Sequence, residues 1–496
     1  MKTKKKIMIR IVKGILWSVG FLLLFFGVTK VLQPKYYFTS DSKSPETEMW
    51  NAYYQEPKES LDVLFLGSSH VYNAINPVTF YKESGLKGFD LCSSGQDLPT
   101  SYFYLKEALR YQKPKYVLMD TFGIFYEAFS DTACYKRSLD DMRWSHVKIE
   151  AIRDWQKTLK KESFLNRIFT IVDYHSRWDS LKQEDFDAAG SMTNINGYCP
   201  YFDYLNDIEH KYYHKDAEVP ELDEQALSYF RKILQLCEEK EITFYLCSVP
   251  DATWTEKHAK VIEKLAKEHR IPYIDYNQDD IYQEIGMVDC EDWRDLGHLN
   301  SRGAEKFSTY LAKDCLKLGW MEANAMEDPV WKERVTSWEH EYLAGMLYMT
   351  VDFDQYLAKL KHPDYSVFMS VKDEGSHGIT YEMKENMMEL GLSCMLYGKE
   401  RNSYFAVISG GEILEQAGEE ELYVKGTLPD GKTEYEVLSA GFKAGNKSSI
   451  RIHDREYSVG KRGLNIVVYD NVSHKVIDSI CFDTHHSMIR ASRKEE

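Results

Sequence analysis

The stretch 61-LDVLFLG-67 is a nearly continuous apolar run that ends in glycine, the pattern of a strand buried on both faces of a parallel sheet. Four similar runs follow, at 88–92 (GFDLC), 116–120 (YVLMD), 242–250 (ITFYLCSVP) and 271–276 (IPYIDY). Between them, apolar residues recur at helical spacing, in 102–112, 224–239 and 259–269. Strands that alternate with helices in this way predict an α/β sandwich of three layers around a parallel sheet.

Other regions lack this alternation. Residues 124–223 contain helical patches and many aromatic residues but no strong strand, which predicts a helical insertion in a domain spanning 61–320. The acidic stretch 321–337 is predicted to be a linker. Short β-rich runs separated by Gly and Asp turns then predict a second, β-rich α+β domain over 338–486.

The N-terminus has the layout of a membrane segment. A basic tail, 1–10, precedes the apolar run 11–32, which is close to the roughly 20 residues needed to cross a bilayer. A cleaved signal peptide is the alternative, but no small-residue cleavage site follows the run. We therefore expect a single-pass anchor, a stalk over 33–60, and a bulk outside the cytoplasm, because basic residues are retained inside.

Composition limits the partners and the compartment. A formal net charge of -16 disfavours nucleic acid as a partner of the whole chain. Nine cysteines, an odd number spread thinly, do not indicate a disulfide framework, and Cys92, Cys237 and Cys247 lie in apolar patterns where a free thiol behaves as a small hydrophobe. An exported chain with few plausible bridges favours a bacterial surface of the Gram-positive type.

The residues that follow the strands suggest chemistry, because functional groups gather at the carboxyl ends of parallel strands. Ser69 follows the first strand, Gly95 and Gln96 follow the second, and Asp295 and His298 follow the last. Alone, each piece has a structural explanation, such as a serine that caps a helix or a histidine that packs in a core. Together, a hydroxyl, a base and a carboxylate indicate an acyl-transfer site.

In this order the motifs resemble the SGNH (GDSL-like) hydrolase superfamily from residue 61 to about 318, which implies a flavodoxin-like parallel sheet. The resemblance implies Ser69 as nucleophile, His298 as base, Asp295 as its partner and Gly95 as an oxyanion donor, with Ser68 in the place of the family's Asp. It implies neither a metal nor another cofactor. The segment from His298 to Gly303 also resembles the alginate O-acetyltransferase and DltD-like branches.

One block departs from the family pattern. The family usually follows its third strand with Gly-x-Asn-Asp, whose Asn adds an oxyanion donor, whereas this chain has 120-DTFG-123. Either Thr121 or Gln96 replaces that donor, or the oxyanion hole has only two donors. A degenerate site is therefore an open alternative.

The second domain carries a separate resemblance. The segments 370-SVKDE-374, 387-MMELGL-392, 462-RGLNIVVYD-470 and 482-FDT-484 resemble the interleukin-like EMT inducer (PANDER-like) domain. Related domains in sugar-modifying enzymes serve as glycan-binding stems, so the resemblance implies carbohydrate recognition. A β-sandwich without a ligand is the alternative.

These observations predict a membrane-anchored serine esterase or O-acyltransferase acting on a cell-surface polysaccharide. Transfer to a sugar would need an acyl donor, which a membrane partner could deliver, as the DltD-like resemblance suggests. The alternative from another class is a non-catalytic surface scaffold that binds glycan or protein through the second domain.

Overall fold

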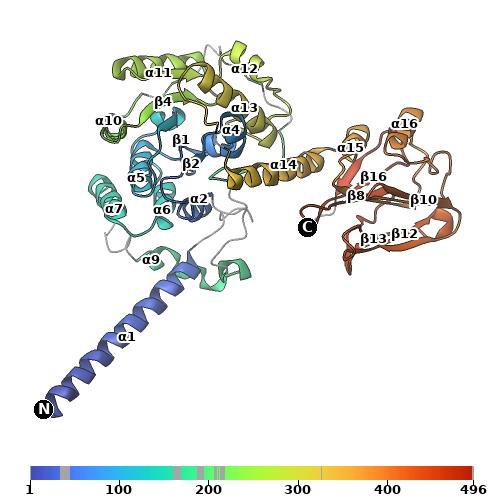
Figure 1. The fold of residues 1–496 in the computed structure, drawn as a ribbon, viewed down its shortest axis with the longest axis horizontal. Helices are drawn as coiled ribbons and strands as arrows, with labels where there is room; N and C mark the ends of the chain where they lie inside the picture. The colour runs from blue at the N-terminus through green and yellow to red at the C-terminus, as the bar shows by residue number, and fades with distance from the viewer. Residues whose placement is uncertain are drawn as a thin grey trace. The chain divides into compact units, whose positions relative to one another are not determined.

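The chain divides into two compact units, residues 1–338 and 339–496. The computed structural model describes residues 2–33, 45–159, 169–186, 195–205, 209–210, 212, 218–219, 221–325 and 327–493 (Figure 1).

The first unit is built on a five-stranded sheet in which every neighbouring pair is parallel. Its strand order is β2-β1-β3-β4-β5. The strands are β1 (Val63–Gly67), β2 (Gly88–Cys92), β3 (Tyr116–Asp120), β4 (Thr243–Ser248) and β5 (Tyr273–Asp275). This is the flavodoxin-like order, and it confirms the predicted fold class. All five strands lie within the apolar runs read from the sequence.

Helices cover both faces of this sheet. Helix α13 packs on α3 and α4, whereas α10 and α7 pack on α5. Val63 and Phe65 of β1 join a core with Phe307 of α13, while the alternate residues Leu64 and Leu66 are fully buried as well. The helices that flank the strands are α3 (Ser69–Ala74), α4 (Pro77–Ser84), α5 (Leu98–Ala108), α10 (Glu224–Glu239), α11 (Glu256–His269), α12 (Asp279–Ile285) and α13 (Ser301–Lys317).

The described part of the predicted insertion, 124–223, is mainly helical, and its only β pairing there is an isolated bridge between Ile195 and Tyr198. Its backbone contacts the loop that follows β2, because the Phe129 amide donates to Asp97 Oδ2 at 2.7 Å. The elements that begin in or next to this region are η1 (Phe122–Phe125), α6 (Thr132–Asp140), α7 (His146–Leu159), α9 (Ile171–Tyr174), η2 (His175–Asp179) and η3 (Gln183–Phe186). Residues 160–168, 187–194 and parts of 206–220 lie outside the described residues.

Helix α1 (Lys2–Leu32) contains the stretch Ile7–Leu32, which is long and apolar enough to cross a membrane. Length and composition of this kind fit an anchor or a signal sequence. The last turn of the helix packs against the folded unit, since Leu32 is buried and Arg177 Nη1 donates to its carbonyl oxygen at 2.6 Å. Lys30 also forms an ion pair with Asp141.

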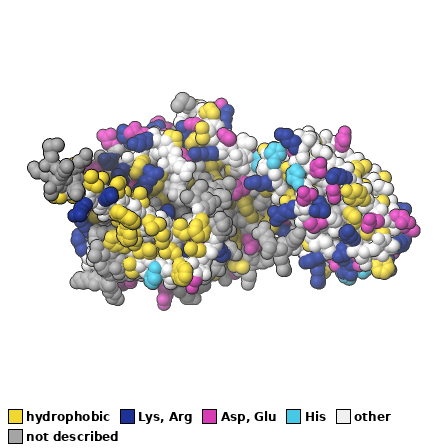
Figure 2. Space-filling view, turned by 90° about the horizontal axis from the view of Figure 1, so that it is seen from below, with side chains coloured by type: hydrophobic (Ala, Val, Ile, Leu, Met, Phe, Trp, Pro, Cys, Tyr) yellow, Lys and Arg dark blue, Asp and Glu magenta, His cyan; other side chains and the backbone are white. Residues whose placement is uncertain are grey.

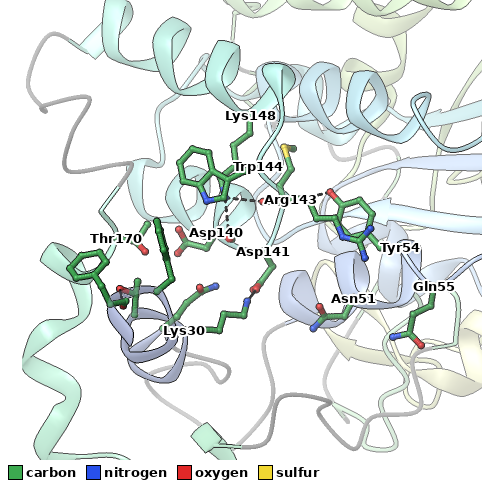
Figure 3. A pocket seen from close by; sticks show the side chains of 15 residues that line it. Lys30, Asn51, Tyr54, Gln55, Asp140, Asp141, Arg143, Trp144, Lys148 and Thr170 are labelled. Atoms are coloured by element: carbon green, nitrogen blue, oxygen red, sulfur yellow. Dashed lines mark hydrogen bonds and ion pairs between the residues drawn. The ribbon is translucent and has the colours of Figure 1, made fainter. Parts of the chain in front are cut away.

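A cavity of about 550 Å³ lies beside the last turns of α1 (Figure 3). Lys30 lines it from α1, Asn51 from α2 (Pro45–Tyr53) and Tyr54 from the turn directly after α2. Arg143 and Trp144 line it from the segment between α6 and α7. Arg143 lies over the Tyr54 ring at 4.2 Å from its centroid. The end of the apolar helix and the folded unit therefore share one amphiphilic pocket.

The prediction of a stalk over 33–60 is wrong for the part that forms helix α2. Trp50 and Tyr53 are fully buried, and the Tyr53 hydroxyl donates to the carbonyl oxygen of Ala108 at 3.0 Å. These rings complete the core beside α5, so the segment from Pro45 onward belongs to the folded unit. Residues 34–44 lie outside the described residues.

The second unit is a ten-stranded, mainly antiparallel sheet centred on β8. Alternate residues of β8 enter different cores: Val367, Met369 and Val371 pack with the unit's helices, and Phe368 packs on the other face. The elements are α15 (Phe353–Lys359), β8 (Tyr365–Asp373), α16 (Tyr381–Glu389), β9 (Ser403–Ser409), β10 (Glu412–Gly418), β11 (Leu422–Thr427), β12 (Glu434–Gly441), η4 (Phe442–Ala444), β13 (Lys447–Ile452), β14 (Arg455–Glu456), β15 (Gly463–Asp470), β16 (Lys475–Phe482) and β17 (Ala491–Arg493). The second domain is β-rich, as predicted.

Helix α14 (Pro329–Met349) includes part of the predicted linker, 321–337. Within the first unit, Arg334 forms an ion pair with Glu56 at 2.9 Å, and the Trp338 indole donates to Glu305 at 3.0 Å. This part of the linker is therefore a helix that packs on the α/β unit, and Trp338 belongs to that unit.

Candidate active site

Ser69 lies at the turn from β1 into α3. Ser68 caps the helix, and Ser69 is its first residue. A side chain at Gly67 would meet Val71 Cγ2 at 2.3 Å, so the turn needs a residue without a Cβ where the strand ends. The sequence Gly-Ser-Ser thus places the Ser69 hydroxyl at the carboxyl edge of the sheet.

Asp295 and His298 lie on a tight hairpin between β6 (Trp293–Asp295) and β7 (His298–Leu299), where they pair with each other across the two strands. Asp295 Oδ1 accepts hydrogen bonds from the Gly297 amide, at 3.0 Å, and from the ring of His298 at Nδ1, at 2.7 Å. Asn300 caps the helix that follows, which fixes the direction of the chain after the hairpin.

The structure brings the three predicted residues together from positions 229 residues apart in sequence. His298 Nε2 lies 2.7 Å from Ser69 Oγ, and Nδ1 of the same ring lies 2.7 Å from Asp295 Oδ1. A hydroxyl in this contact can pass its proton to the imidazole while the carboxylate holds the ring and stabilises its charged form. The ring is partly exposed, with 24% of its side chain accessible, so a substrate can reach it.

The ionisation of Asp295 fits that arrangement. Burial raises the pKa of its carboxyl, but the hydrogen bond from His298, the charge of that ring and the Gly297 amide lower it more. The net pKa lies below the usual value, and the group is a carboxylate at neutral pH.

Two of the predicted substrate-binding side chains do not face the site. Gln96 is buried and donates from Nε2 to Leu91 O and Ser101 Oγ, while its oxygen accepts from Ser93. Thr121 is fully buried, and its hydroxyl lies 2.6 Å from Ser248 Oγ. Both side chains satisfy buried polar groups of the loops, so neither replaces the missing Asn donor.

Ser68 and Gly95 shape the two loops that border the site. The Ser68 side chain is fully buried and accepts from the amide of His70, so it shapes the turn and does not contact substrate. Gly95 has φ +58, in the left-handed region that favours glycine, and a Cβ there would lie 3.3 Å from Cys134 Sγ. Glycine is thus required at the position where a backbone amide is expected to face the oxyanion.

A second histidine–aspartate pair lies directly against the first. His70, the neighbour of Ser69, has its ring 4.8 Å from the ring of His298 and 3.8 Å from that of Phe122. Its Nε2 lies 3.0 Å from Asp251 Oδ2, and its Nδ1 lies 2.9 Å from Ser68 Oγ. Both His70 and Asp251 are buried.

This pair was not predicted, although the sequence carries a signal for it. Asp251 directly follows the fourth apolar run and Asp120 ends the third, so both lie at the end of a strand, as Ser69 does. His70 directly follows Ser69 in the sequence. Nothing in the spacing showed that its ring would meet Asp251, because 181 residues separate them.

No metal centre is apparent at the site. Among the residues that the structure describes, no group of three or more His, Cys, Asp or Glu side chains could hold a metal ion. The nine cysteines, all of which lie in the described residues, are free thiols. Cys92, Cys237 and Cys247 are buried, as their apolar surroundings in the sequence predicted.

Comparisons with known proteins give fold likeness only. No family model and no curated protein matches the chain. Among solved structures, one similar chain is a protein provisionally assigned as an acylhydrolase from Bacteroides fragilis, with 14% identity and a TM-score of 0.26 over 54% of this chain and 93% of that one. Another is a GDSL-like lipase from Bacteroides thetaiotaomicron, with 13% identity and a TM-score of 0.24 over 54% and 99%. At these values the likeness gives no information about activity.

Proposed function

We propose that the α/β unit is a serine esterase or O-acyltransferase, tethered to a membrane by α1, that acts on a cell-surface polysaccharide. The observation that carries the proposal is the chain of two 2.7 Å contacts that joins Ser69 Oγ, the His298 ring and Asp295 Oδ1. The names of the similar solved structures agree with acyl chemistry, although they add no independent argument.

The reaction follows from these contacts. Ser69 Oγ attacks the acyl carbonyl carbon, its proton passes to His298 Nε2, and the carbonyl π electrons move onto oxygen. Collapse of this tetrahedral intermediate expels the leaving alkoxide, which takes the proton from His298, and leaves the acyl group on Ser69. Water completes hydrolysis, whereas a sugar hydroxyl completes transfer. His298 removes the proton of the incoming hydroxyl in either case.

The oxyanion is held by backbone amides in this proposal. The amides of Ser69 and Gly95 are the two donors, since the side chains of Thr121 and Gln96 are engaged elsewhere. A donor of this kind contributes about 3 kcal/mol to the transition state in well-studied hydrolases. The site therefore works with fewer donors than the family pattern supplies.

Covalent labelling tests the proposal. Incubation of the full chain in detergent with a fluorophosphonate is expected to add one phosphonyl group, mapped by peptide mass spectrometry to Ser69. Ser69→Ala should abolish the adduct. Ser94→Ala is the matched control, because Ser94 lies on the loop that follows β2 and its hydroxyl lies 3.0 Å from that of Tyr72, not next to the His298 ring. No adduct on the folded wild-type chain would favour the non-catalytic scaffold.

The anchor is part of the proposal. Segment 169–186 contacts the end of α1, with the Phe25 and Phe169 rings 5.6 Å apart, and it exposes Trp178, which is 74% accessible. Exposed aromatic side chains beside a membrane-spanning helix are typical of the bilayer interface. Figure 2 shows apolar side chains gathered on one face of the α1-bearing unit.

Quenching of tryptophan fluorescence by brominated phospholipid tests whether segment 169–186 lies at the bilayer interface. In vesicles that hold the full chain, Trp178→Phe is expected to remove a quenchable component, because the indole lies at the headgroup level. Trp17→Phe in α1 should do the same, and Trp254→Phe should not, since Trp254 is buried. Unchanged quenching in Trp178→Phe would show that the segment stands clear of the bilayer.

Glycan binding belongs to the second unit in this proposal. A cavity of about 860 Å³ there is lined by Tyr348 and Tyr457 together with His453, His474 and Arg455. Aromatic faces and polar side chains around a concave site are what sugar recognition requires. The resemblance to the interleukin-like EMT inducer domain supports the same role. For transfer to a sugar, we also propose that a membrane partner delivers the acyl donor.

A further inference from the structure

Carboxylates surround the candidate site. Asp295 contacts His298, Asp251 contacts His70, and Asp120 ends β3 with both oxygens bound to backbone amides, those of Phe122 and Val249. A negative charge that develops on the substrate oxygen would form in their field, which opposes it.

His70 is the one buried basic side chain described among these acids. Its two ring nitrogens contact Ser68 Oγ and Asp251 Oδ2, and that carboxylate oxygen has no other partner among the described residues. The other Asp251 oxygen accepts from the amide and the hydroxyl of Thr253, both at 2.7 Å. An imidazolium fits this environment, because it can donate from both nitrogens.

The pair is also joined to the hairpin of the triad. The Ala252 amide, next to Asp251, donates to the carbonyl oxygen of Leu296 at 3.0 Å. A Cβ on Gly297 would lie 3.1 Å from His70 Nε2, so the hairpin passes directly over the ring. Any change in the charge of His70 therefore acts at close range on both Ser69 and His298.

We propose that His70, held by Asp251, is a positioning residue whose positive charge balances the buried carboxylates and so permits an oxyanion to form beside Ser69. This inference rests on the proposed acyl-transfer function. It also accounts for a site without the family's Asn donor, because a fixed positive charge one residue from the nucleophile offsets part of the missing stabilisation.

The charge of His70 persists to higher pH than that of a free histidine. Burial lowers the pKa of the ring, but the contact and charge of Asp251, with Asp120 and Asp295, raise it more, and the net pKa is raised. Burial raises the pKa of Asp120 to about 6, and the pKa of Asp251 is lowered overall although burial alone raises it. The imidazolium is thus present below the raised pKa and lost as pH rises through it.

Three variants separate this charge role from a purely mechanical one, with p-nitrophenyl acetate hydrolysis by the full chain as the readout. His70→Gln leaves Asp251 as an unbalanced charge and is expected to lower kcat on the order of 100-fold with little change in KM. Asp251→Asn removes one negative charge and should cost less than about 10-fold. The double variant restores neutrality and should recover about 10-fold of the kcat lost in His70→Gln.

A purely mechanical role of the His70–Asp251 pair predicts a different pattern of kcat losses. If the pair only held the hairpin in place, either single variant would break the same contact, the two losses would be equal, and the double variant would recover nothing. That result would overturn the inference. Melting temperatures of all three variants show whether each chain is folded. Absence of esterase activity in the wild-type chain would instead contradict the proposed function.

The pH profile provides a second readout, and its wild-type arm does not depend on the folding of any variant. In wild type, kcat should fall on the alkaline side as His70 loses its proton, while Asp120, Asp251, Asp295 and His298 face the same ring and set where this occurs. The double variant should lack that alkaline limb. A wild-type kcat that stays flat to alkaline pH would contradict the inference.

Discussion

Ser69→Ala is expected to lower kcat for p-nitrophenyl acetate hydrolysis by a factor on the order of 10⁴ or more, and His298→Gln by a similar factor. Each change removes one end of the 2.7 Å contact through which the hydroxyl loses its proton. Because the two residues act as one unit, the double variant should be no less active than either single variant. Burst and steady-state kinetics on purified full chain measure all three.

Stability distinguishes a catalytic loss from a structural one. The His298 side chain is 24% accessible, so its replacement should change the melting temperature little. A marked fall in melting temperature in His298→Gln would identify the ring as a core element. Additive losses in the double variant would mean that Ser69 and His298 act independently, against the proposed triad.

Trp50→Ala is expected to destabilise the α/β unit by about 3–5 kcal/mol. The indole is fully buried, with the Tyr54 ring at 5.1 Å and the Tyr104 ring at 4.9 Å, so its removal leaves a large cavity in the core beside α5. Denaturant unfolding followed by circular dichroism measures the change. A small effect would restore the interpretation of this segment as a stalk.

Trp178→Ala is the matched control for that experiment. The same side chain is lost there, but its accessible fraction is 74%, and the expected change is within about 0.5 kcal/mol. The comparison isolates burial as the cause, because both variants remove an indole from the same unit.

Local pattern was enough to predict the sheet. Runs such as 61–67 and 116–120 are short and nearly continuously apolar, which is typical of a strand covered on both faces, so five strands could be predicted without tertiary information. The stalk was predicted wrongly from 45 onward for the opposite reason. Helix α2 has no strong apolar period, and its place in the core depends on partners, such as Tyr104, that lie far along the chain.

The sequence by itself determined the fold class and the apolar N-terminal helix, since both depend on local periodicity. Through the order of its motifs it also indicated the three side chains that meet at the site. Only the tertiary structure decided that Gln96 and Thr121 face inward and that His70 meets Asp251. The physical reason is that the direction of a polar side chain depends on which distant donors and acceptors the folded chain brings to it, and no local pattern encodes them.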